Sequence, residues 1–241
     1  MKVTDTVRDK INRLEAGYVF TYSDFDIQVD KVSALKKVLN QLVESGKISR
    51  LSKGRFYKSR KTEFGELKPD AYQVVKDLLE KDGKVTGYLT GYSAYNELGL
   101  TTQVSNTIQI GSKVDKKAIS RGIYKVKFIR QRNNITKENI PLLRILDSIR
   151  NIKEIPDTTV DKACEQIKLL IKELNQNEIN SLKKLALNYN ASTRALTGAI
   201  IETIFNENEE QALFKSLNPA TKYVFSISEV TLANKQKWNI Q

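Results

Sequence analysis

Apolar residues at the start of the chain recur with the period of a helix. Residues 3–15 carry an apolar side chain at every third or fourth position, which predicts an amphipathic helix. Thr21 is a predicted N-cap for a short helix through Phe25, with Asp24 completing a capping box. A longer helix is predicted over residues 32–45 and ends at Gly46, because its apolar residues share one face: Leu35, Val38, Leu39, Leu42 and Val43.

The run after this helix, residues 46–61, changes to two short β-prone segments around Ser52-Lys53-Gly54. Turn-forming residues between two such segments predict a tight hairpin. The run holds seven cations and no carboxylate: Lys47, Arg50, Lys53, Arg55, Lys58, Arg60 and Lys61. A helix followed by a basic hairpin is the arrangement of a winged helix-turn-helix, in which the helix enters a DNA major groove and the hairpin contacts the flanking backbone.

Further along the chain the pattern mixes both element types. Residues 62–69 are predicted to be a linker, because Gly65 and Pro69 interrupt any regular element. Helices are then predicted over 70–81, 91–98 (with Thr90 as N-cap) and 137–151, and strands over 84–89, 104–110 and 123–129. From Val160 the pattern is helical, over about 160–175, 178–188, 192–206 and 208–217, and Tyr223 to Ile227 is a predicted terminal strand.

These elements predict an α+β protein with three parts. An N-terminal winged helix-turn-helix is expected over residues 1–62, followed by a linker over 63–69. A mixed α/β body is expected over 70–155, with a mainly helical C-terminal part over 156–241. Tyr88, Tyr92 and Tyr95 are expected in the core rather than as a base-stacking platform, and Trp238 is either a docking anchor or frayed.

The positive charge is concentrated in the first two thirds of the chain. Residues 1–154 hold 30 of the 40 Lys and Arg and 18 of the 28 Asp and Glu, a net charge of +12, whereas residues 155–241 hold ten of each. Such asymmetry favours a polyanionic partner for the front of the chain. The alternative is a basic surface that only confers solubility.

The predicted DNA-binding residues come from the helix over 32–45 and from the hairpin. Asn and Gln suit adenine edges, and Lys suits guanine edges or phosphate. The hairpin cations are expected on phosphates, where they position the protein without reading sequence. The set is Ser33, Lys36, Lys37, Asn40, Gln41, Arg50, Ser52, Lys53, Arg55 and Lys58.

A second basic patch is expected around the loop between the strands over 104–110 and 123–129. Only Asp115 opposes its cations: Lys113, Lys116, Lys117, Arg121, Lys125, Lys127, Arg130 and Arg132. It could extend the DNA footprint or dock an acidic partner protein, and the sequence slightly favours the partner surface.

The composition excludes several kinds of chemistry. The chain has no histidine, which removes the commonest general base and metal ligand. The single cysteine, Cys164, falls on an apolar helical rhythm and is expected to be buried and unreactive. Gly111-Ser112 is not followed by the Asp-x-Asp pair of a nucleotidyltransferase, and both a P-loop and a dinucleotide fingerprint are missing. The sequence therefore favours a protein that is not an enzyme and needs neither cofactor nor metal.

The chain has no apolar run near the ~20 residues that span a bilayer, and its start lacks the apolar segment of a signal peptide. A cytoplasmic protein without membrane contact is expected.

Three stretches together resemble the AbiEi-type antitoxins, the transcriptional regulators of type IV toxin–antitoxin and abortive-infection operons. They are Phe20–Phe25, Leu51–Tyr57 and Thr86–Thr101, the last of which ends in Leu98-Gly99-Leu100-Thr101. The resemblance covers roughly residues 5–205 and leaves the last 35 residues without a match.

The resemblance implies a winged helix that binds inverted repeats in its own promoter and represses the operon. An oligomer on DNA is possible, and the sequence does not set the oligomeric state. It also implies a C-terminal antitoxin-type domain that counteracts an AbiEii-like nucleotidyltransferase toxin without needing a stable complex. Two alternatives stay open. One is a histidine-free, Mg²⁺-dependent enzyme that processes nucleic acid, and the other is a non-enzymatic adaptor that binds an acidic protein.

Overall fold

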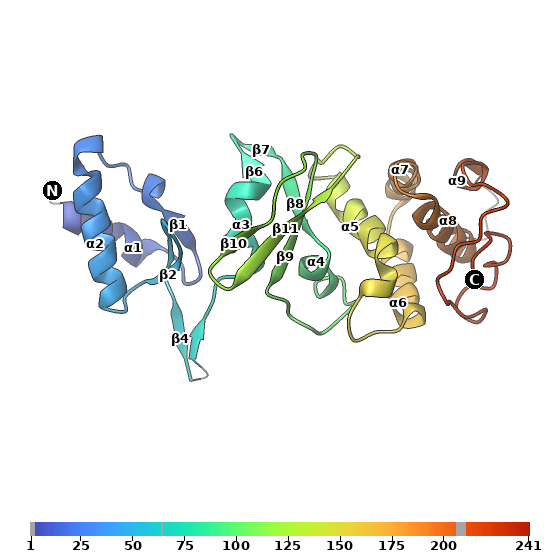
Figure 1. Cartoon of the computed structure of the whole chain (residues 1–241), viewed down its shortest axis with the longest axis horizontal. Helices are drawn as coiled ribbons and strands as arrows, with labels where there is room; N and C mark the ends of the chain where they lie inside the picture. Colours follow the sequence, from blue (N-terminus) through green and yellow to red (C-terminus); the bar gives the residue numbers. More distant parts are fainter. Residues whose placement is uncertain (1–2, 64, 206–210) are drawn as a thin grey trace. The chain divides into compact units, whose positions relative to one another are not determined.

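A computed structural model describes residues 3–63, 65–205 and 211–241 (Figure 1). The chain is a mixed α+β protein of two compact units. The first comprises residues 1–77 and 120–124, and the second comprises residues 78–119 and 125–241. Among the described residues, no helix combines the length and apolar character needed to cross a membrane.

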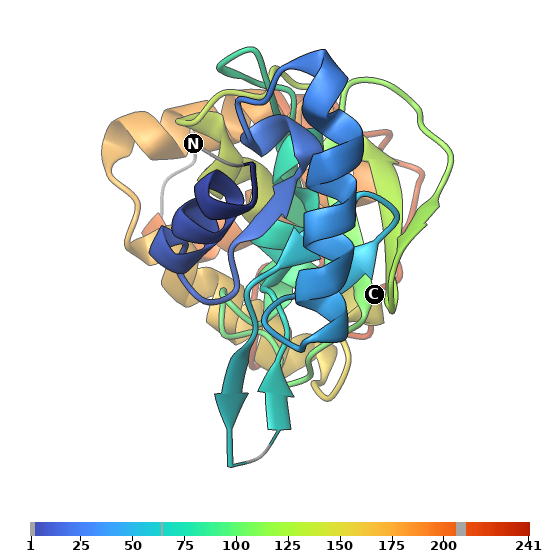
Figure 2. The same ribbon diagram turned by 90° about the vertical axis from the view of Figure 1, so that its left-hand side faces the viewer.

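The N-terminal part of the first unit is built from two helices and a small antiparallel sheet (Figure 2). The sheet has the order β1-β3-β2, so the last strand in sequence lies in the middle. The elements are α1 (Val3–Arg13), β1 (Val19–Thr21), the 3-10 turns η1 (Tyr22–Asp24) and η2 (Val29–Lys31), α2 (Val32–Glu44), β2 (Ser49–Ser52) and β3 (Arg55–Tyr57). The two predicted helices and the predicted hairpin are thus confirmed as elements.

Local chemistry explains where these elements begin and turn. The Thr21 amide donates to Asp24 Oδ2 over 2.6 Å, which is half of the predicted capping box. Gly54 lies between β2 and β3 with a φ of +74°, a conformation that only glycine adopts without strain. The core of the unit joins the apolar faces of α1 and α2 to Phe20 and Phe56, whose rings stack 6.1 Å apart.

The segment predicted to be an irregular linker contains a second hairpin. β4 (Arg60–Thr62) pairs antiparallel with β5 (Gly65–Leu67). The expectation that Gly65 would interrupt any regular element was therefore wrong, because its φ of +110° suits the turn that joins the two strands. All described residues of β5 are exposed, so the strand has no apolar alternation that a sequence pattern could reveal. The helix α3 (Ala71–Leu79) follows.

A four-stranded sheet has the order β10-β11-β9-β8, and its strands β8 and β9 lie wholly in the second unit. β8 pairs antiparallel with β9, and β9 pairs parallel with β11. The strands are β6 (Glu80–Lys81) and β7 (Lys84–Val85), which form a separate hairpin, and β8 (Gly87–Thr90), β9 (Thr107–Ser112), β10 (Ile119–Arg121) and β11 (Tyr124–Arg130). The short helix α4 (Tyr92–Tyr95) follows β8, and its N-cap is Gly91 rather than the predicted Thr90, which ends the strand.

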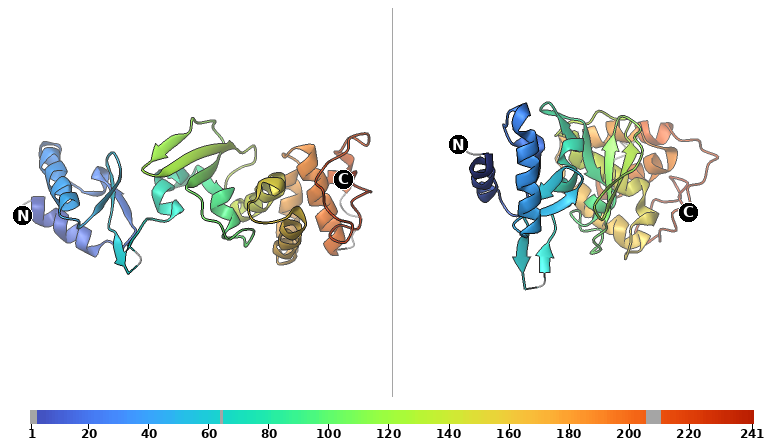
Figure 3. Two further views of the ribbon diagram at one scale, coloured as in Figure 1. Left: turned by 60° about the horizontal axis from the view of Figure 1, so that its bottom comes forward. Right: turned by 60° about the vertical axis from the view of Figure 1, so that its left-hand side comes forward.

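Helices make up most of the second unit after its sheet (Figure 3). They are α5 (Asn139–Arg150), the 3-10 turn η3 (Ile152–Glu154), α6 (Val160–Lys172), α7 (Gln176–Ala186), α8 (Ala191–Phe205) and α9 (Gln211–Lys215). α5 packs against α6, α7 and α8. The core includes Tyr88, Tyr95 and Cys164, as expected from the sequence, with Tyr92 packed against it. Residues 206–210, which the predicted helices 192–206 and 208–217 include in part, lie outside the described residues.

The predicted terminal strand from Tyr223 to Ile227 was wrong. Its side chains alternate between buried and exposed, as in a strand. Among the described residues, however, it forms a single isolated bridge, from Tyr223 to Ile240, with backbone hydrogen bonds to Asn239 and Gln241. Trp238 is buried, and its indole donates to Glu202 Oε2 over 2.6 Å. The end of the chain is therefore fixed to α8 and is not frayed.

Candidate functional site

The outer face of α2 carries all five polar residues that the sequence predicts for DNA contact. Ser33, Lys36, Lys37, Asn40 and Gln41 are all exposed. The opposite face is buried in the core of the unit and consists of Leu35, Val38, Leu39 and Leu42. The period of 3.6 residues per turn places the apolar and polar residues on opposite sides of the helix. Burial of the apolar side therefore leaves the polar side exposed.

Two cations on this side of the first unit are oriented by aromatic and amide partners. The Arg50 guanidinium donates to Asn40 Oδ1 over 2.6 Å and lies 5.5 Å from the centre of the Phe56 ring. Lys36 Nζ lies 5.7 Å from the centre of the Tyr22 ring. Cation–π contacts of this kind hold a charged side chain in place without neutralising it. Both cations therefore keep their charge for an anionic partner.

Some cations of the hairpin are exposed, and others are bound to groups of the chain itself. Lys53 is exposed at the turn, and Ser52 beside it is half-buried. Arg55 pairs with Asp77 over 2.8 Å. Lys58 donates to the carbonyls of Asn12 and Leu14, over 2.9 and 3.0 Å, at the end of α1.

Lys58 satisfies carbonyls that a helix C-terminus leaves without partners. Its role here is structural, and Arg55 is likewise engaged within the chain. The side chains of Arg60 and Lys61 lie outside what the structure describes.

Arg121 does not belong to an exposed basic patch, which corrects the sequence prediction. Its side chain is only 4% exposed. Its guanidinium donates to both carboxylate oxygens of Asp77 and to the Val74 carbonyl, the latter over 2.6 Å. Burial alone would raise the pKa of Asp77, but the guanidinium groups of Arg121 and Arg55 outweigh it and lower that pKa.

The other members of the second basic patch are exposed and lie in the second unit. Arg130 pairs with Asp115, and Lys116 Nζ lies 5.3 Å from the centre of the Phe128 ring. Lys113 donates to the backbone carbonyl of Arg132 over 2.9 Å. The exposed set is Lys113, Lys116, Lys117, Lys125, Lys127, Arg130 and Arg132.

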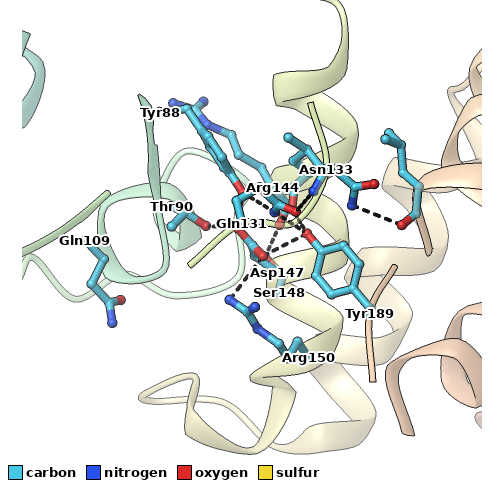
Figure 4. Close-up of polar contacts among 12 residues, drawn as sticks. Tyr88, Thr90, Gln109, Gln131, Asn133, Arg144, Asp147, Ser148, Arg150 and Tyr189 are labelled. Carbon is cyan, nitrogen blue, oxygen red and sulfur yellow. Dashed lines mark hydrogen bonds and ion pairs between the residues drawn. The ribbon is translucent and has the colours of Figure 1, made fainter. Parts of the chain in front are cut away.

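A buried polar cluster that the sequence analysis did not predict surrounds Asp147 on α5 (Figure 4). The Asp147 carboxylate, only 1% exposed, accepts hydrogen bonds from Tyr88 (2.6 Å), Thr90 (2.6 Å) and Tyr189 (2.9 Å). It also pairs with Arg150 over 3.2 Å. Such a set of donors satisfies a charge that would otherwise be costly to bury. One sequence signal was present, since Asp147 lies four residues after Leu143 on the apolar face of α5.

Side chains of Gln131 and Asn133 extend the cluster towards the segment after α7. Gln131 Nε2 donates to the hydroxyls of Tyr88 and Tyr189, each over 2.8 Å. Asn133 Oδ1 accepts from Asn188 Nδ2 over 2.7 Å. Burial, and next the charge of Asp147, raise the pKa values of Tyr88 and Tyr189 well above the usual range, so both phenols stay protonated donors.

A cavity of about 260 Å³ lies beside this cluster in the second unit. Three arginines contribute to its wall, from the end of β11, the following residues and the end of α5. The wall consists of Arg130, Gln131, Arg132, Arg150, Asn188, Tyr189 and Asn190. Two of these arginines were predicted as members of the basic patch, but no local pattern joins them to Arg150 or to the asparagines.

Cys164 offers no chemistry of its own. It is fully buried in the core of the second unit, and burial raises the pKa of its thiol to about 12. Among the described residues, no group of three or more Asp, Glu and Cys side chains is arranged to hold a metal ion.

Comparison with known proteins identifies the family but not an activity. Residues 6–179 match a family of unknown function (DUF6088), and the chain belongs to this family. The crystal structure of the Rv2827c protein from Mycobacterium tuberculosis is similar, with a TM-score of 0.63 over 93% of this chain and 85% of that chain. The sequence identity is 13%, so the likeness concerns the fold alone. Among curated proteins, none matches this chain.

Proposed function

We propose that this protein is a transcription regulator that binds double-stranded DNA through a winged helix-turn-helix in its first unit. In this proposal α2 is the recognition helix and the β2–β3 hairpin is the wing. The order of α1, β1, two short 3-10 turns, α2 and a hairpin whose second strand pairs with β1 supports the assignment.

The observation that carries the proposal is the chemistry of the exposed face of α2. It presents two lysines and two side-chain amides, and Arg50 of the hairpin is hydrogen-bonded to one of those amides, Asn40. Among the described residues of α2, only Glu44 is acidic, and it is the last residue of the helix. A face that offers positive charge and amide groups suits phosphates and base edges in a major groove.

The contacts proposed for DNA differ between helix and hairpin. Asn40 and Gln41 are assigned to base edges in the groove, and Lys36 and Lys37 to the phosphates that flank it, with Ser33 near one end of the helix. Arg50 and Lys53 are assigned to phosphates. Arg55 and Lys58 are assigned a supporting role, because each already has a partner inside the first unit.

The antitoxin role is a further part of the proposal and has different support. It rests on the resemblance of Phe20–Phe25, Leu51–Tyr57 and Thr86–Thr101 to AbiEi-type antitoxins. In this role the chain represses its own operon at inverted repeats and counteracts a nucleotidyltransferase-like toxin encoded beside it. Co-expression with the neighbouring gene tests the role, since the full chain should then relieve growth arrest caused by that gene's product.

A gel-shift experiment tests the DNA-binding proposal. The probe is the duplex directly upstream of the coding sequence, in competition with an unrelated duplex of equal length. The triple variant Lys36→Ala, Lys37→Ala, Arg50→Ala should bind at least about a hundredfold more weakly than the unmodified protein, because three phosphate or base contacts are lost.

The matched control is Lys84→Ala, Lys172→Ala, Lys222→Ala, which removes the same charge from exposed positions of the second unit. It should bind as the unmodified protein does. Equal binding by both triple variants would contradict the assignment of α2 and Arg50.

The two alternative functions, an enzyme and an adaptor, predict other results with the same purified protein. An enzyme would convert labelled DNA or RNA in the presence of Mg²⁺, whereas a regulator leaves the probe intact. An adaptor for an acidic protein would show no affinity for the duplex and would retain its partner after nuclease treatment.

A further inference from the structure

The cavity beside the Asp147 cluster is lined by three arginines. Arg130, Arg132 and Arg150 all contribute to its wall, and no carboxylate does. The remaining members of the wall are amides and the Tyr189 phenol. Guanidinium groups with nearby amide donors form the type of surface that proteins use to bind phosphate groups.

The side chain of Arg132 is exposed. Within the part of the chain that the structure describes, its guanidinium makes no hydrogen bond or ion pair. Arg130 pairs only with Asp115, and both side chains of that pair are largely exposed, at 64% and 67%. An exposed ion pair contributes little free energy and exchanges readily. Both guanidinium groups can therefore turn to a ligand at small cost.

Arg150 is held in place before any ligand arrives. It pairs with buried Asp147 over 3.2 Å, and its guanidinium lies 5.5 Å from the centre of the Tyr189 ring. Tyr88, Thr90 and Tyr189 already donate to Asp147, so the carboxylate does not depend on Arg150 alone. A cation fixed in this way binds an anion with little loss of conformational entropy.

The two asparagines of the wall are also oriented. Asn188 Nδ2 donates to Asn133 Oδ1 over 2.7 Å. Asn190 Oδ1 accepts from the Thr193 amide over 2.9 Å and from the Ser192 hydroxyl over 3.0 Å. The oxygen of Asn190 is thus occupied, which leaves its amide NH₂ group as a donor for a ligand.

We propose that this cavity binds a small phosphomonoester. A doubly charged phosphate group matches three guanidinium groups better than a single carboxylate does, because each guanidinium donates in a fork. The volume of about 260 Å³ is below the usual range for drug-sized ligands, so a phosphosugar or similar molecule fits better than a dinucleotide. The site lies entirely in the second unit and is independent of the DNA-binding proposal for the first.

Calorimetric titration of the full chain tests the proposal, with inorganic phosphate, ribose 5-phosphate, adenosine monophosphate and adenosine as separate probes. We expect saturable binding of ribose 5-phosphate, competition by inorganic phosphate and no binding of adenosine. Stronger binding of adenosine monophosphate than of ribose 5-phosphate would identify the source of the phosphate as a nucleotide.

Arg132→Gln should weaken the binding of ribose 5-phosphate about tenfold or more, since one charged hydrogen-bonding group is lost. Lys172→Gln is the matched control, because it removes the same charge from an exposed position outside the cavity. It should leave the affinity unchanged. Arg150→Lys should also weaken binding, because lysine keeps the charge but loses the fork.

Three results would overturn the proposal. The first is no saturable binding of any phosphorylated probe up to about 10 mM, which corresponds to less than about 3 kcal/mol. The second is equal weakening by Arg132→Gln and Lys172→Gln. The third is binding of duplex DNA, but of no small phosphate, that Arg132→Gln abolishes, which would assign the cavity to nucleic acid.

Discussion

The Arg50 guanidinium donates a 2.6 Å hydrogen bond to the side-chain oxygen of Asn40, which joins β2 to the exposed face of α2. The contact leaves the Asn40 amide NH₂ as a donor and fixes the position of the Arg50 charge beside it. The aromatic ring of Phe56 supports the same guanidinium from the core side of the hairpin. One polar group for base edges and one charge for phosphate are thus held as a pair.

The first prediction concerns this pair. Arg50→Ala should lower the affinity for duplex DNA about tenfold, because one phosphate contact and the orientation of Asn40 are lost together. It should change the free energy of unfolding by less than about 1 kcal/mol, because both side chains are exposed. Fluorescence anisotropy and urea unfolding measure the two quantities. An Arg50→Ala variant with unaltered DNA affinity would remove the hairpin from the interface.

The Asp77 carboxylate pairs with two arginines of the first unit, Arg55 and Arg121. Asp77→Asn should lower the free energy of unfolding by about 2 kcal/mol at pH 7, because it leaves the buried Arg121 guanidinium without its anion. The figure lies below that for a fully buried pair, since the Asp77 side chain is 44% exposed. Glu80→Gln, at an exposed position, is the control and should have little effect.

The same carboxylate sets a pH dependence. Its folded-state pKa lies below the ordinary value, so its stabilising contribution is present above about pH 4 and is lost as the pH falls through the folded-state pKa. The difference in unfolding free energy between the unmodified protein and Asp77→Asn should therefore shrink below about pH 4. A difference that persists unchanged at about pH 2 would show that the charge of Asp77 is not its source.

We expect the protein to lose stability in alkali because of the buried phenols of Tyr88 and Tyr189. Their folded-state pKa values are raised above the ordinary value of about 10, first by burial and then by the Asp147 charge. Their contribution to stability is therefore fully present below about pH 10 and is lost as the pH rises further. Tyr88→Phe should be less stable by about 1–2 kcal/mol at neutral pH but lose less on going to about pH 11. Thermal unfolding at the two pH values measures this, and parallel declines in both proteins would count against it.

Gly198 on α8 makes room for Trp238. A Cβ atom at position 198 would lie 2.2 Å from the indole Cη2, so Gly198→Ala forces the ring or the helix to move. We expect a loss of about 1–3 kcal/mol from overpacking, reduced by the better helix propensity of alanine. Because Trp238 is the single tryptophan, its fluorescence reports the change directly.

The Trp238→Phe background provides the control for this substitution. The smaller ring should accept the added methyl group, so Gly198→Ala should cost less there than in the unmodified protein. The same cost in both backgrounds would mean that the contact between Gly198 and Trp238 does not cause the loss.

Helices and strands with one buried face could be predicted from the sequence. α2 and the β2–β3 hairpin followed from the spacing of Leu35, Leu39 and Leu42 and from the turn at Gly54. The β4–β5 hairpin was missed because β5 has no buried side to produce a pattern. The segment from Tyr223 to Ile227 alternates as a strand does, but among the described residues its pairing with the segment around Ile240 amounts to one isolated bridge.

In the candidate sites too, features set by helical periodicity could be predicted from the sequence, whereas features set by tertiary contacts could not. The exposed set on α2 follows from helical periodicity alone. Whether a cation is exposed does not follow from local sequence, since Arg121 finds Asp77 44 residues away. The cavity beside Asp147 brings together β11, α5 and the residues between α7 and α8, and only tertiary packing shows that Arg132, Arg150 and Asn190 share a wall.

The most direct test of the account is the salt dependence of DNA binding. The logarithm of the binding constant should fall with the logarithm of salt concentration with a slope of about −5, as expected when about six phosphates are neutralised. Lys36→Ala combined with Lys37→Ala should make that slope less negative by about 2, whereas Lys84→Ala combined with Lys172→Ala should leave it unchanged. An unchanged slope in the first variant, or equal changes in both, would contradict the assignment of α2 to the DNA interface.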